Sequence, residues 1–189
     1  MSENNTPFIH STALVDTSDI GSNTRIWAFV HILKNVTIGN NCNICDHCFV
    51  EQNVQIGNNV TVKSGIYIWE GVHIEDNVFL GPNVVFTNDV RPRSKQYVEV
   101  QKTLLKEGAS IGANSTILAG VTMGKYCMTG IGSVITKDVP DHALVYGNPA
   151  RIKGWVDELG QKLKQHSSTE WVSEDGIIYK QTDNGLTKK

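Results

Sequence analysis

Three closely spaced cysteines are the first group in this sequence whose type and spacing suggest chemistry. Cys42, Cys45 and Cys48 follow one another at intervals of three residues, a spacing that occurs in zinc and iron–sulfur sites. Six histidines could also bind a metal or transfer protons. Whether either set can act together depends on the elements that carry them.

A six-residue repeat predicts those elements. When the chain is written in sixes from Asp19, the second residue of each hexad is large and apolar up to Phe86. The sixth residue is small, and Cys42 and Cys48 occupy this position in two successive hexads. A period of six fits neither a helix nor a simple strand alternation. It is typical of a parallel β-helix, in which three short strands and three corners close a triangular coil of eighteen residues. Leu14 and Phe8 extend the apolar series backwards at the same spacing.

The repeat argues against a metal centre at the cysteines. It places Cys42 and Cys48 inside the prism on two different faces, whereas Cys45 points outward. Three thiols so placed cannot converge on one ion, so we predict that they fill the core, as small buried thiols commonly do. Cys127 is expected at the equivalent interior position of a later hexad.

The apolar register breaks once, which predicts a loop. It stops at Phe86 and resumes at Ile111, 25 residues later, and this distance is not a multiple of six. The segment between them is polar, basic and without period. A long loop inside a compact domain is usually functional. We therefore expect a β-helix domain over residues 8–154 with a loop insertion at about 88–107.

A column of polar residues is predicted at the root of that loop. Residues eighteen apart should lie one above the other at roughly the 4.8 Å spacing of paired strands. This stacks Asn88 on Glu70, Gln52 and Lys34, and Trp69 adds apolar surface beside the carboxylate. Such a ladder can simply solvate a flat face, but its position at the loop favours a binding site.

The last 35 residues, 155–189, are predicted to form a short helix and a hairpin. Trp155, Val156, Leu159 and Leu163 lie on one helical stripe. Asp175 and Gly176 are typical of a hairpin turn, followed by a frayed end.

Composition excludes several classes of protein. The 189 residues carry a net charge of −2, which provides no basic field for nucleic acid. The apolar runs are too short to cross a bilayer. The amino-terminal residues lack the pattern of an export signal, and four cysteines without one are typical of reduced thiols in a cytoplasmic protein.

Beyond the repeat, several motifs resemble one enzyme family. They are Trp69-Glu70-Gly71, the segment from Thr87 to Ser94, and the segment from Gly147 to Arg151. Together with the hexads, they resemble the left-handed β-helix N-acetyltransferases that acetylate a nucleotide-linked 3-amino sugar with acetyl-CoA. The resemblance is nearest to enzymes for dTDP-3-amino-3,6-dideoxyhexoses. A sister group acts on UDP-2-acetamido-3-amino-glucuronate and shares the segment from Trp27 to His31.

The resemblance also implies roles for individual residues. Asn88 and Glu70 would hydrogen-bond the 3-amino group as catalytic residues, the CoA thiolate would take the proton, and backbone N–H groups of later coils would stabilise the oxyanion. Substrate contacts are expected from Arg91, Arg93, Lys95, His31 and Trp69. Residues expected to bind acetyl-CoA are Gly112, Ala113, Ala119, Gly120, Gly130, Lys137, Pro149, Arg151 and Lys153. Members of this family act as homotrimers with active sites between subunits, in surface polysaccharide (lipopolysaccharide O-antigen) biosynthesis, and require no metal.

Three alternatives remain at this stage. His31, outward at a corner, could be the general base of a hexapeptide O-acetyltransferase. A γ-type carbonic anhydrase is disfavoured because no two histidines have the close spacing of its zinc ligands. A scaffold is disfavoured because it would need neither the basic insertion nor the segment from Gly147 to Arg151. An ice-binding surface is disfavoured because Thr24, Thr37 and Thr61 do not share one coil position.

Overall fold

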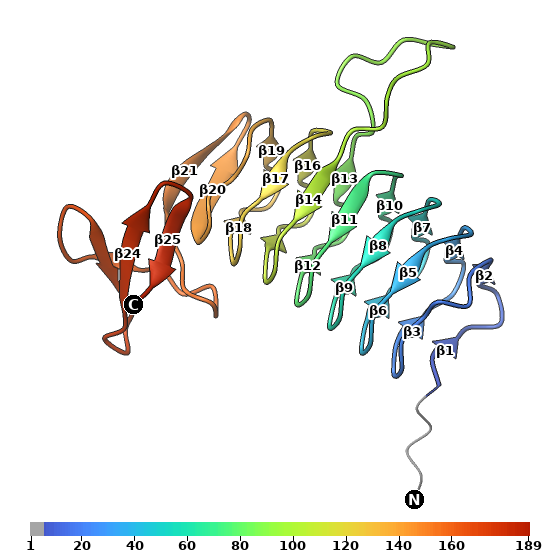
Figure 1. The fold of residues 1–189 in the computed structure, drawn as a ribbon, viewed down its shortest axis with the longest axis horizontal. Coiled ribbons are helices and arrows are strands. Elements are labelled where there is room, and N and C mark those ends of the chain that lie inside the picture. The colour runs from blue at the N-terminus through green and yellow to red at the C-terminus, as the bar shows by residue number, and fades with distance from the viewer. Residues whose placement is uncertain (1–5) are drawn as a thin grey trace, which may run out of the picture.

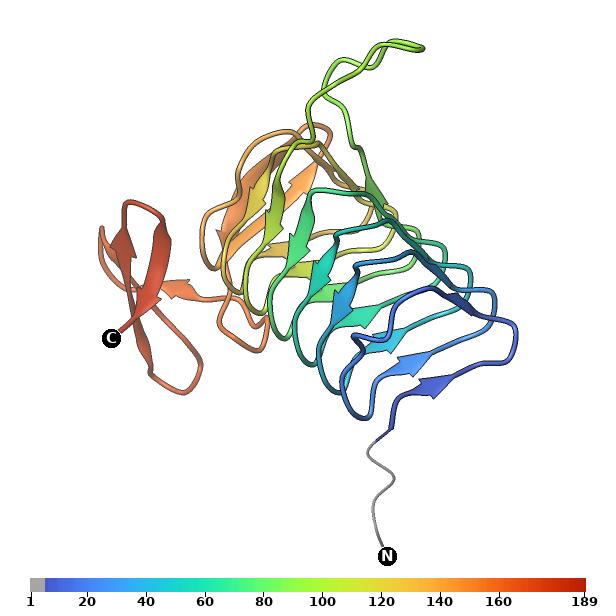
Figure 2. The ribbon, with the colours of Figure 1, turned by 45° about the vertical axis from the view of Figure 1, so that its right-hand side comes forward.

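The protein is a prism of stacked triangular coils with a small sheet at its carboxyl-terminal end (Figure 1). A computed structural model of the chain describes residues 6–189, which form 25 strands and no helix. Three sheets make the sides of the prism, and the chain passes from sheet A to sheet B to sheet C in each coil. Figure 2 shows the coils obliquely, with the loop and the small sheet outside the prism. The predicted left-handed parallel β-helix is confirmed.

The strands of the prism are short, and most contain two residues. Sheet A contains β1 (Phe8–Ile9), β3 (Arg25–Ile26), β6 (Asn43–Ile44), β9 (Thr61–Val62), β12 (Phe79–Leu80), β15 (Ser110–Ile111), β18 (Met128–Thr129), β20 (Ala143–Gly147) and β21 (Ala150–Trp155). Sheet B contains β2 (Leu14–Val15), β4 (His31–Ile32), β7 (Phe49–Val50), β10 (Tyr67–Ile68), β13 (Val85–Phe86), β16 (Thr116–Ile117) and β19 (Val134–Ile135). Sheet C contains β5 (Thr37–Ile38), β8 (Gln55–Ile56), β11 (Val72–Ile74), β14 (Thr103–Leu105) and β17 (Thr122–Met123). All neighbouring strands pair in parallel except β20 and β21.

The interior of the prism follows the predicted hexad positions, except in the first coil. From Ile26 onward, the apolar residues of the repeat and the small residues between them are buried, Cys42, Cys48 and Cys127 among them. In the first coil, Leu14 pairs with His31 and is 62% exposed, and Phe8 pairs with Arg25. Ile9 and Val15 occupy the interior register instead. The backward extension through Leu14 and Phe8 is therefore wrong by one residue, because this coil is one residue shorter than the others.

The corners depend on residues that tolerate a left-handed backbone. Asparagine is the commonest residue at these positions, with φ near +60° at, for example, Asn35, Asn53, Asn59 and Asn77. We call the corner between sheets B and C the BC corner, and name the CA and AB corners in the same way. Glycines stack at the CA corner, where a Cβ on Gly39 would lie 2.6 Å from the backbone carbonyl of the glycine one coil later.

The predicted loop leaves the prism at the BC corner. It connects Phe86 of β13 to Thr103 of β14 and rises away from the coils (Figure 1). It is shorter than the expected range 88–107, because Thr103–Leu105 pair with Val72–Ile74 as a strand of sheet C. Ile74 and Leu105 are partners 31 residues apart, so the loop adds 13 residues to an eighteen-residue coil.

The carboxyl-terminal helix predicted for the segment from Gly154 to Gln165 is wrong. Trp155 ends β21, which pairs with Ala143 of β20, and Gly160 with φ +79° interrupts any helix that would follow. The segment turns instead, and the Asp157 carboxylate accepts the N–H groups of Leu159 and Gln161. Leu159, which the helical stripe placed on the buried face, is 82% exposed.

A small antiparallel sheet follows the last coil. Its strands are β22 (Lys164–Gln165), β23 (Glu170–Val172), β24 (Ile178–Thr182) and β25 (Gly185–Lys188). The predicted hairpin at Asp175-Gly176 is confirmed between β23 and β24, whereas the expected frayed end forms β25. Tyr179 is fully buried, its ring makes an edge-to-face contact with His142, and its hydroxyl donates a hydrogen bond to Glu158. These contacts attach the sheet to the prism.

Over residues 6–189, the structure has no helix that is long and apolar enough to cross a membrane.

Candidate active site

A straight column of residues runs along the BC corner. Strand pairing aligns the interior residues of sheet B from Ile32 to Ile135. Two positions after each of them come the members of the column, which are Lys34, Gln52, Glu70, Asn88, Ala119 and Lys137. The pairing therefore supports the predicted stack of Asn88 on Glu70 and Gln52. It also extends the column past the loop, with neighbours separated by roughly 4.8 Å.

The loop encloses one side of a cleft at the middle of this column. The cleft has a volume of about 320 Å³. Its lining residues are Glu51, Glu70, Asn88, Asp89, Pro92, Arg93, Gln96, Val98 and Val100. Three residues chosen from the sequence, Glu70, Asn88 and Arg93, thus lie around one cavity. A carboxylate, an amide and a guanidinium there could receive an amine and a phosphate in neighbouring positions.

Glu70 is held by amide groups of the preceding coil. Asn53 Nδ2 donates to Glu70 Oε1 at 2.6 Å, and Gln52 Nε2 donates to Glu70 Oε2 at 3.3 Å. These hydrogen bonds, Asn53 first, lower the pKa of the Glu70 carboxyl below its ordinary value. Glu70 is therefore an anion at neutral pH and a poor proton acceptor.

Trp69 supports the cleft from the side. Its indole N–H donates to the Phe86 carbonyl oxygen at 2.7 Å, and its ring packs against Phe49 and Tyr67. Trp69 does not line the cleft itself. Because Trp69 precedes Glu70 and bonds the residue at which the loop begins, it is placed to hold the corner beneath the loop.

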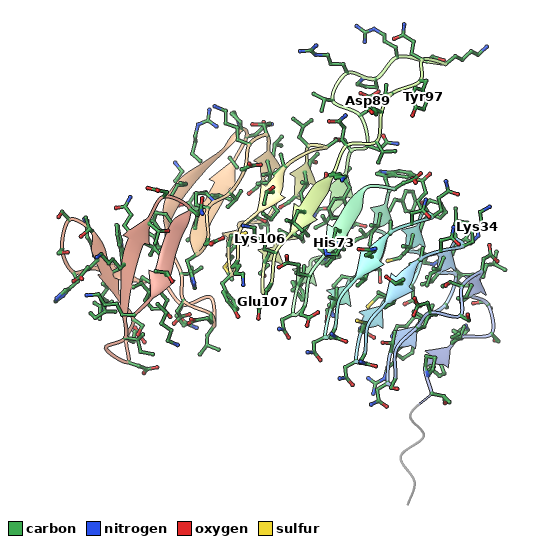
Figure 3. The ribbon with its side chains drawn as sticks, viewed as in Figure 1. Lys34, His73, Asp89, Tyr97, Lys106 and Glu107 are labelled. Carbon is green, nitrogen blue, oxygen red and sulfur yellow. The ribbon has the colours of Figure 1, made fainter. Side chains whose placement is uncertain are left out.

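Two acidic residues of the cleft were missed by the sequence analysis. Glu51 Oε2 accepts the Glu70 backbone N–H at 2.8 Å, and Asp89 Oδ1 accepts the Arg91 N–H at 2.6 Å. Asp89 directly follows Asn88 at the start of the loop, so the sequence could have predicted that it lies in the same cleft. Figure 3 shows Asp89 and Tyr97 on the loop that rises above the coils.

Besides Trp69, three predicted substrate residues lie outside this cleft. Arg91 and Lys95 are exposed on the loop but do not line the cavity. His31 lies on β4, with Nε2 4.0 Å from Asp16 Oδ2 and its ring on edge against Phe49. Within residues 6–189, no histidine lines the cleft.

A second cleft of about 260 Å³ lies at the carboxyl-terminal end of the same corner. It brings Lys137 together with Arg151 of the β20–β21 hairpin. Lys153, from the same hairpin, instead lies with Nζ 5.6 Å from the centre of the Tyr146 ring. Pro149 is exposed in the turn of this hairpin.

Small residues separate the two clefts. Ala119 and Gly120 follow Asn88 along the BC corner and leave no bulky side chain between it and Lys137. Their N–H groups donate to the hydroxyls of Thr87 and Thr103, at 2.9 and 3.0 Å. These two amides are therefore engaged within the fold and are not free oxyanion donors.

The other small residues expected to bind CoA lie elsewhere. Gly112, Ala113 and Gly130 are at the AB corner, after strands of sheet A. A Cβ on Gly112 would lie 2.6 Å from the Thr129 carbonyl oxygen, so close stacking of coils explains this glycine. The structure does not bring these three residues together with Ala119, Gly120 and Lys137.

The sequence matches two family models of the hexapeptide repeat. The model "Bacterial transferase hexapeptide (six repeats)" matches residues 17–52 and 53–88, and "Hexapeptide repeat of succinyl-transferase" matches residues 35–70 and 107–137. The chain is also 63% identical over 183 residues to dTDP-3-amino-3,6-dideoxy-alpha-D-galactopyranose 3-N-acetyltransferase from Aneurinibacillus thermoaerophilus. That alignment covers 96% of this chain and 95% of the relative.

The chain belongs to the bacterial hexapeptide transferases. Its similarity to a 3-N-acetyltransferase over nearly the full length of both proteins shows that this hexapeptide transferase is an acetyltransferase.

Two solved acyltransferase structures share the fold. An N-acyltransferase from Bacillus cereus, in a variant form with dTDP and coenzyme A, is 20% identical with a TM-score of 0.61, covering 78% of this chain and 79% of that one. A variant of GDP-perosamine N-acetyltransferase from Caulobacter crescentus, with CoA and GDP-perosamine, is 21% identical with a TM-score of 0.59, covering 79% and 57%.

The cysteines of this hexapeptide transferase have the predicted positions. Cys42 and Cys48 are buried and Cys45 is partly exposed at a corner. Burial raises the pKa of the Cys48 thiol to about 11. Across residues 6–189, no group of three or more His, Cys, Asp or Glu side chains is placed to hold a metal ion.

Proposed function

We propose that this acetyltransferase transfers the acetyl group of acetyl-CoA to the C3 amine of a dTDP-linked 3-amino-3,6-dideoxyhexose. The observation that carries this proposal is the 63% identity, over nearly the whole of both chains, to an enzyme named for that reaction with the galactose isomer. The cleft supports it, because Glu70, Asn88 and Arg93 suit an amine next to a phosphorylated sugar.

Glu70 and Asn88 are proposed to hold the reacting amine. A sugar amine is largely protonated at neutral pH, and the ionised Glu70 carboxylate would bind the ammonium form. The Asn88 side chain lies one coil further along and would orient the nitrogen towards the thioester. Holding two substrates in line can by itself supply much of the rate acceleration.

The proton leaves by a route that does not need a histidine. The bound ammonium first releases one proton to solvent water. Attack of the resulting neutral amine on the thioester carbon forms the C–N bond, and collapse of the tetrahedral intermediate breaks the C–S bond. The departing CoA thiolate then takes the proton from nitrogen. Because the Ala119 and Gly120 amides are engaged by threonine hydroxyls, the Asn88 amide is the proposed donor to the oxyanion.

Acetyl-CoA is proposed to lie along the carboxyl-terminal half of the BC corner. Ala119 and Gly120 would allow the pantetheine chain to approach the backbone, and Lys137 and Arg151 would contact phosphates. Two solved structures with this fold contain coenzyme A together with a nucleotide or a nucleotide sugar. The loop residue Arg93 would contact the sugar's diphosphate, with Arg91 and Lys95 near the loop surface.

A homotrimer belongs to the same proposal. The outward residues of sheet B are mostly apolar, with Leu14, Tyr67 and Val85 about half exposed or more. A second copy packed on this face would lie beside the BC corner and close the open side of the cleft. A cytoplasmic location and a role in surface polysaccharide synthesis are proposed with it, and four free cysteines suit a reducing compartment.

The test is CoA release from acetyl-CoA with two acceptors assayed in parallel. One is dTDP-3-amino-3,6-dideoxygalactose and the other is UDP-2-acetamido-3-amino-glucuronate. The proposal expects turnover with the dTDP sugar and at least 100-fold less with the UDP sugar. Preference for the UDP sugar would move the enzyme to the sister group, and no turnover with either would reject the 3-amino sugar.

A further inference from the structure

An asparagine one coil before the site makes the strongest contact to the Glu70 side chain. Asn53 has a left-handed backbone with φ +62°, and its Nδ2 lies 2.6 Å from Glu70 Oε1. Gln52 Nε2 contacts the other carboxylate oxygen at 3.3 Å. Each oxygen therefore receives one neutral amide donor, and the carboxylate is fixed in one orientation with its charge intact.

This contact differs from the ordinary corner ladder. Asn59, which is also left-handed, bonds the asparagine eighteen residues later: its Nδ2 donates to Asn77 Oδ1 at 3.1 Å. Asn53 receives such a bond from Asn35 at 3.3 Å. The next position in its own column is Gly71, which has no side chain to accept the Asn53 amide.

The loop explains why that position is a glycine. A Cβ on Gly71 would lie 2.4 Å from the Gln101 carbonyl oxygen, because the returning limb of the loop passes over it. Gly71 also has φ +89°. The ladder therefore ends where the loop returns, and the free amide of Asn53 turns to Glu70 instead.

The neighbours of Glu70 leave its charge without a counterion. Over residues 6–189, no Lys, Arg or His forms an ion pair with Glu70 within 4 Å. Glu51 and Asp89 add two more carboxylates to the cleft wall. An arginine or lysine partner would have fixed Glu70 equally well but would have neutralised it. Amide partners orient the carboxylate and keep it available to a cation.

We propose that Asn53, assisted by Gln52, is a positioning residue that presents the ionised Glu70 carboxylate to the substrate ammonium. Through this contact it sets the preference of the site for a C3 amine over a C3 hydroxyl. This inference rests on the proposed function, because it assumes that the amino sugar binds at Glu70. The inference predicts that loss of the Asn53 amide changes the selectivity between the C3 amine and the C3 hydroxyl, and does not weaken the binding of both sugars equally.

The experiment compares the binding of two ligands by calorimetry without acetyl-CoA. The ligands are dTDP-3-amino-3,6-dideoxygalactose and dTDP-6-deoxygalactose, which carries a hydroxyl at C3. Asn53→Ala should reduce the amine-to-hydroxyl affinity ratio by about tenfold, the loss expected when one charge-assisted contact is misaligned. The affinity for the hydroxyl sugar should not change.

Asn59→Ala is the matched control. Asn59 is also left-handed, bonds the next asparagine in its column, and lies at the CA corner, so its removal should leave the ratio unchanged. If Asn53→Ala does not fold, Asn53→Gly tolerates the left-handed backbone, removes the same amide donor without adding charge, and should also lower the ratio.

The inference would be overturned if a folded Asn53 variant lost affinity equally for both ligands, or if its amine-to-hydroxyl affinity ratio were unchanged. A wild-type protein that binds the two sugars equally would overturn it as well and leave the dTDP sugar as ligand. A wild-type protein that binds neither sugar would instead reject the proposed function, together with the inference that rests on it.

Discussion

The BC and CA corners are turns of the same coils, yet they use their polar side chains differently. At the CA corner, Asn40, Asn58 and Asp76 each accept a backbone N–H from the previous coil, at 2.7–2.9 Å. Each side chain of this ladder is therefore already hydrogen-bonded to a backbone amide of the neighbouring coil. At the BC corner, a loop interrupts the stack and leaves Glu70 and Asn88 facing a cleft.

The difference shows how a repetitive fold acquires a site. The CA corner stabilises the prism by satisfying backbone groups, which is the default use of asparagine and aspartate in turns. The BC corner keeps the same register but directs two side chains outward and covers them with a loop. Changes at the two corners should therefore affect different measurements.

The largest effect is expected on activity at the BC corner. Asn88→Ala and Glu70→Gln should each lower kcat/KM by about 100- to 1,000-fold, the loss seen when one preorganised transition-state contact is removed. Melting temperatures should remain near wild type because neither side chain is buried. Asn58→Ala, at the CA corner, is the control and should lower the melting temperature with little effect on kcat/KM. Active Asn88→Ala protein would contradict the assignment.

A large effect on stability is expected at the CA corner. In Gly39→Ala, the added methyl would lie 2.6 Å from backbone atoms of Gly57 in the next coil. Such overpacking costs about 1–3 kcal/mol, and each kcal/mol shifts the melting temperature of a chain this size by roughly 2–4 °C. Urea unfolding would measure the loss. A variant as stable as the wild type would show that the coils can separate freely there.

A smaller effect is expected at the second cleft of the BC corner. Lys137→Ala and Arg151→Ala should each raise the KM for acetyl-CoA about three- to fivefold, since exposed charge pairs contribute about 1 kcal/mol or less. The KM for the amino sugar should not change. Lys125→Ala is the matched control, because Lys125 pairs with Glu107 at the CA corner. Equal effects of all three changes would indicate a general influence of net charge.

The smallest effect concerns the pH dependence of stability. Hydrogen bonds from Asn53 and Gln52 lower the pKa of Glu70, and those from the Asn58 backbone and side chain lower the pKa of Asp76. A lowered carboxyl pKa stabilises the folded state above the ordinary value, 4.5 for Glu70 and 3.8 for Asp76. That contribution disappears as the pH falls through the lowered pKa.

Glu70→Gln and Asp76→Asn should therefore melt closer to the wild type at pH 3 than at pH 7. Both variants should show this small trend, whereas only Glu70→Gln should lose activity. If the difference in melting temperature between variant and wild type were larger at pH 3 than at pH 7, the carboxylates would not be stabilised in the folded state.

Much of the prism and the centre of the site could be predicted from the sequence. The hexad period gives the inward and outward positions, and its break gives the loop. Adding eighteen residues at a time then places Asn88 on Glu70. The same count also separates Gly112 and Gly130, which follow sheet A, from Ala119, which follows sheet B. The prediction that they bind acetyl-CoA together did not use this information.

Other features could not be predicted because local patterns were ambiguous. Phe8-Ile9 and Leu14-Val15 each offer two adjacent apolar residues, so a coil one residue short leaves the pattern almost unchanged. Trp155, Val156 and Leu163 fit a helical stripe, yet they pack between the last coil and the small sheet. Only the tertiary partners Trp171 and Tyr179 decide between these structures.

The stacked coils give the molecule a nearly one-dimensional order of stability, because each coil contacts only its neighbours. Fraying in such a stack starts at the ends and moves inward one coil at a time. Glu70 and Asn88 are the third and fourth members of a six-membered column, and the attached sheet protects the carboxyl-terminal end. Loss of the first coil would therefore leave the reacting centre assembled.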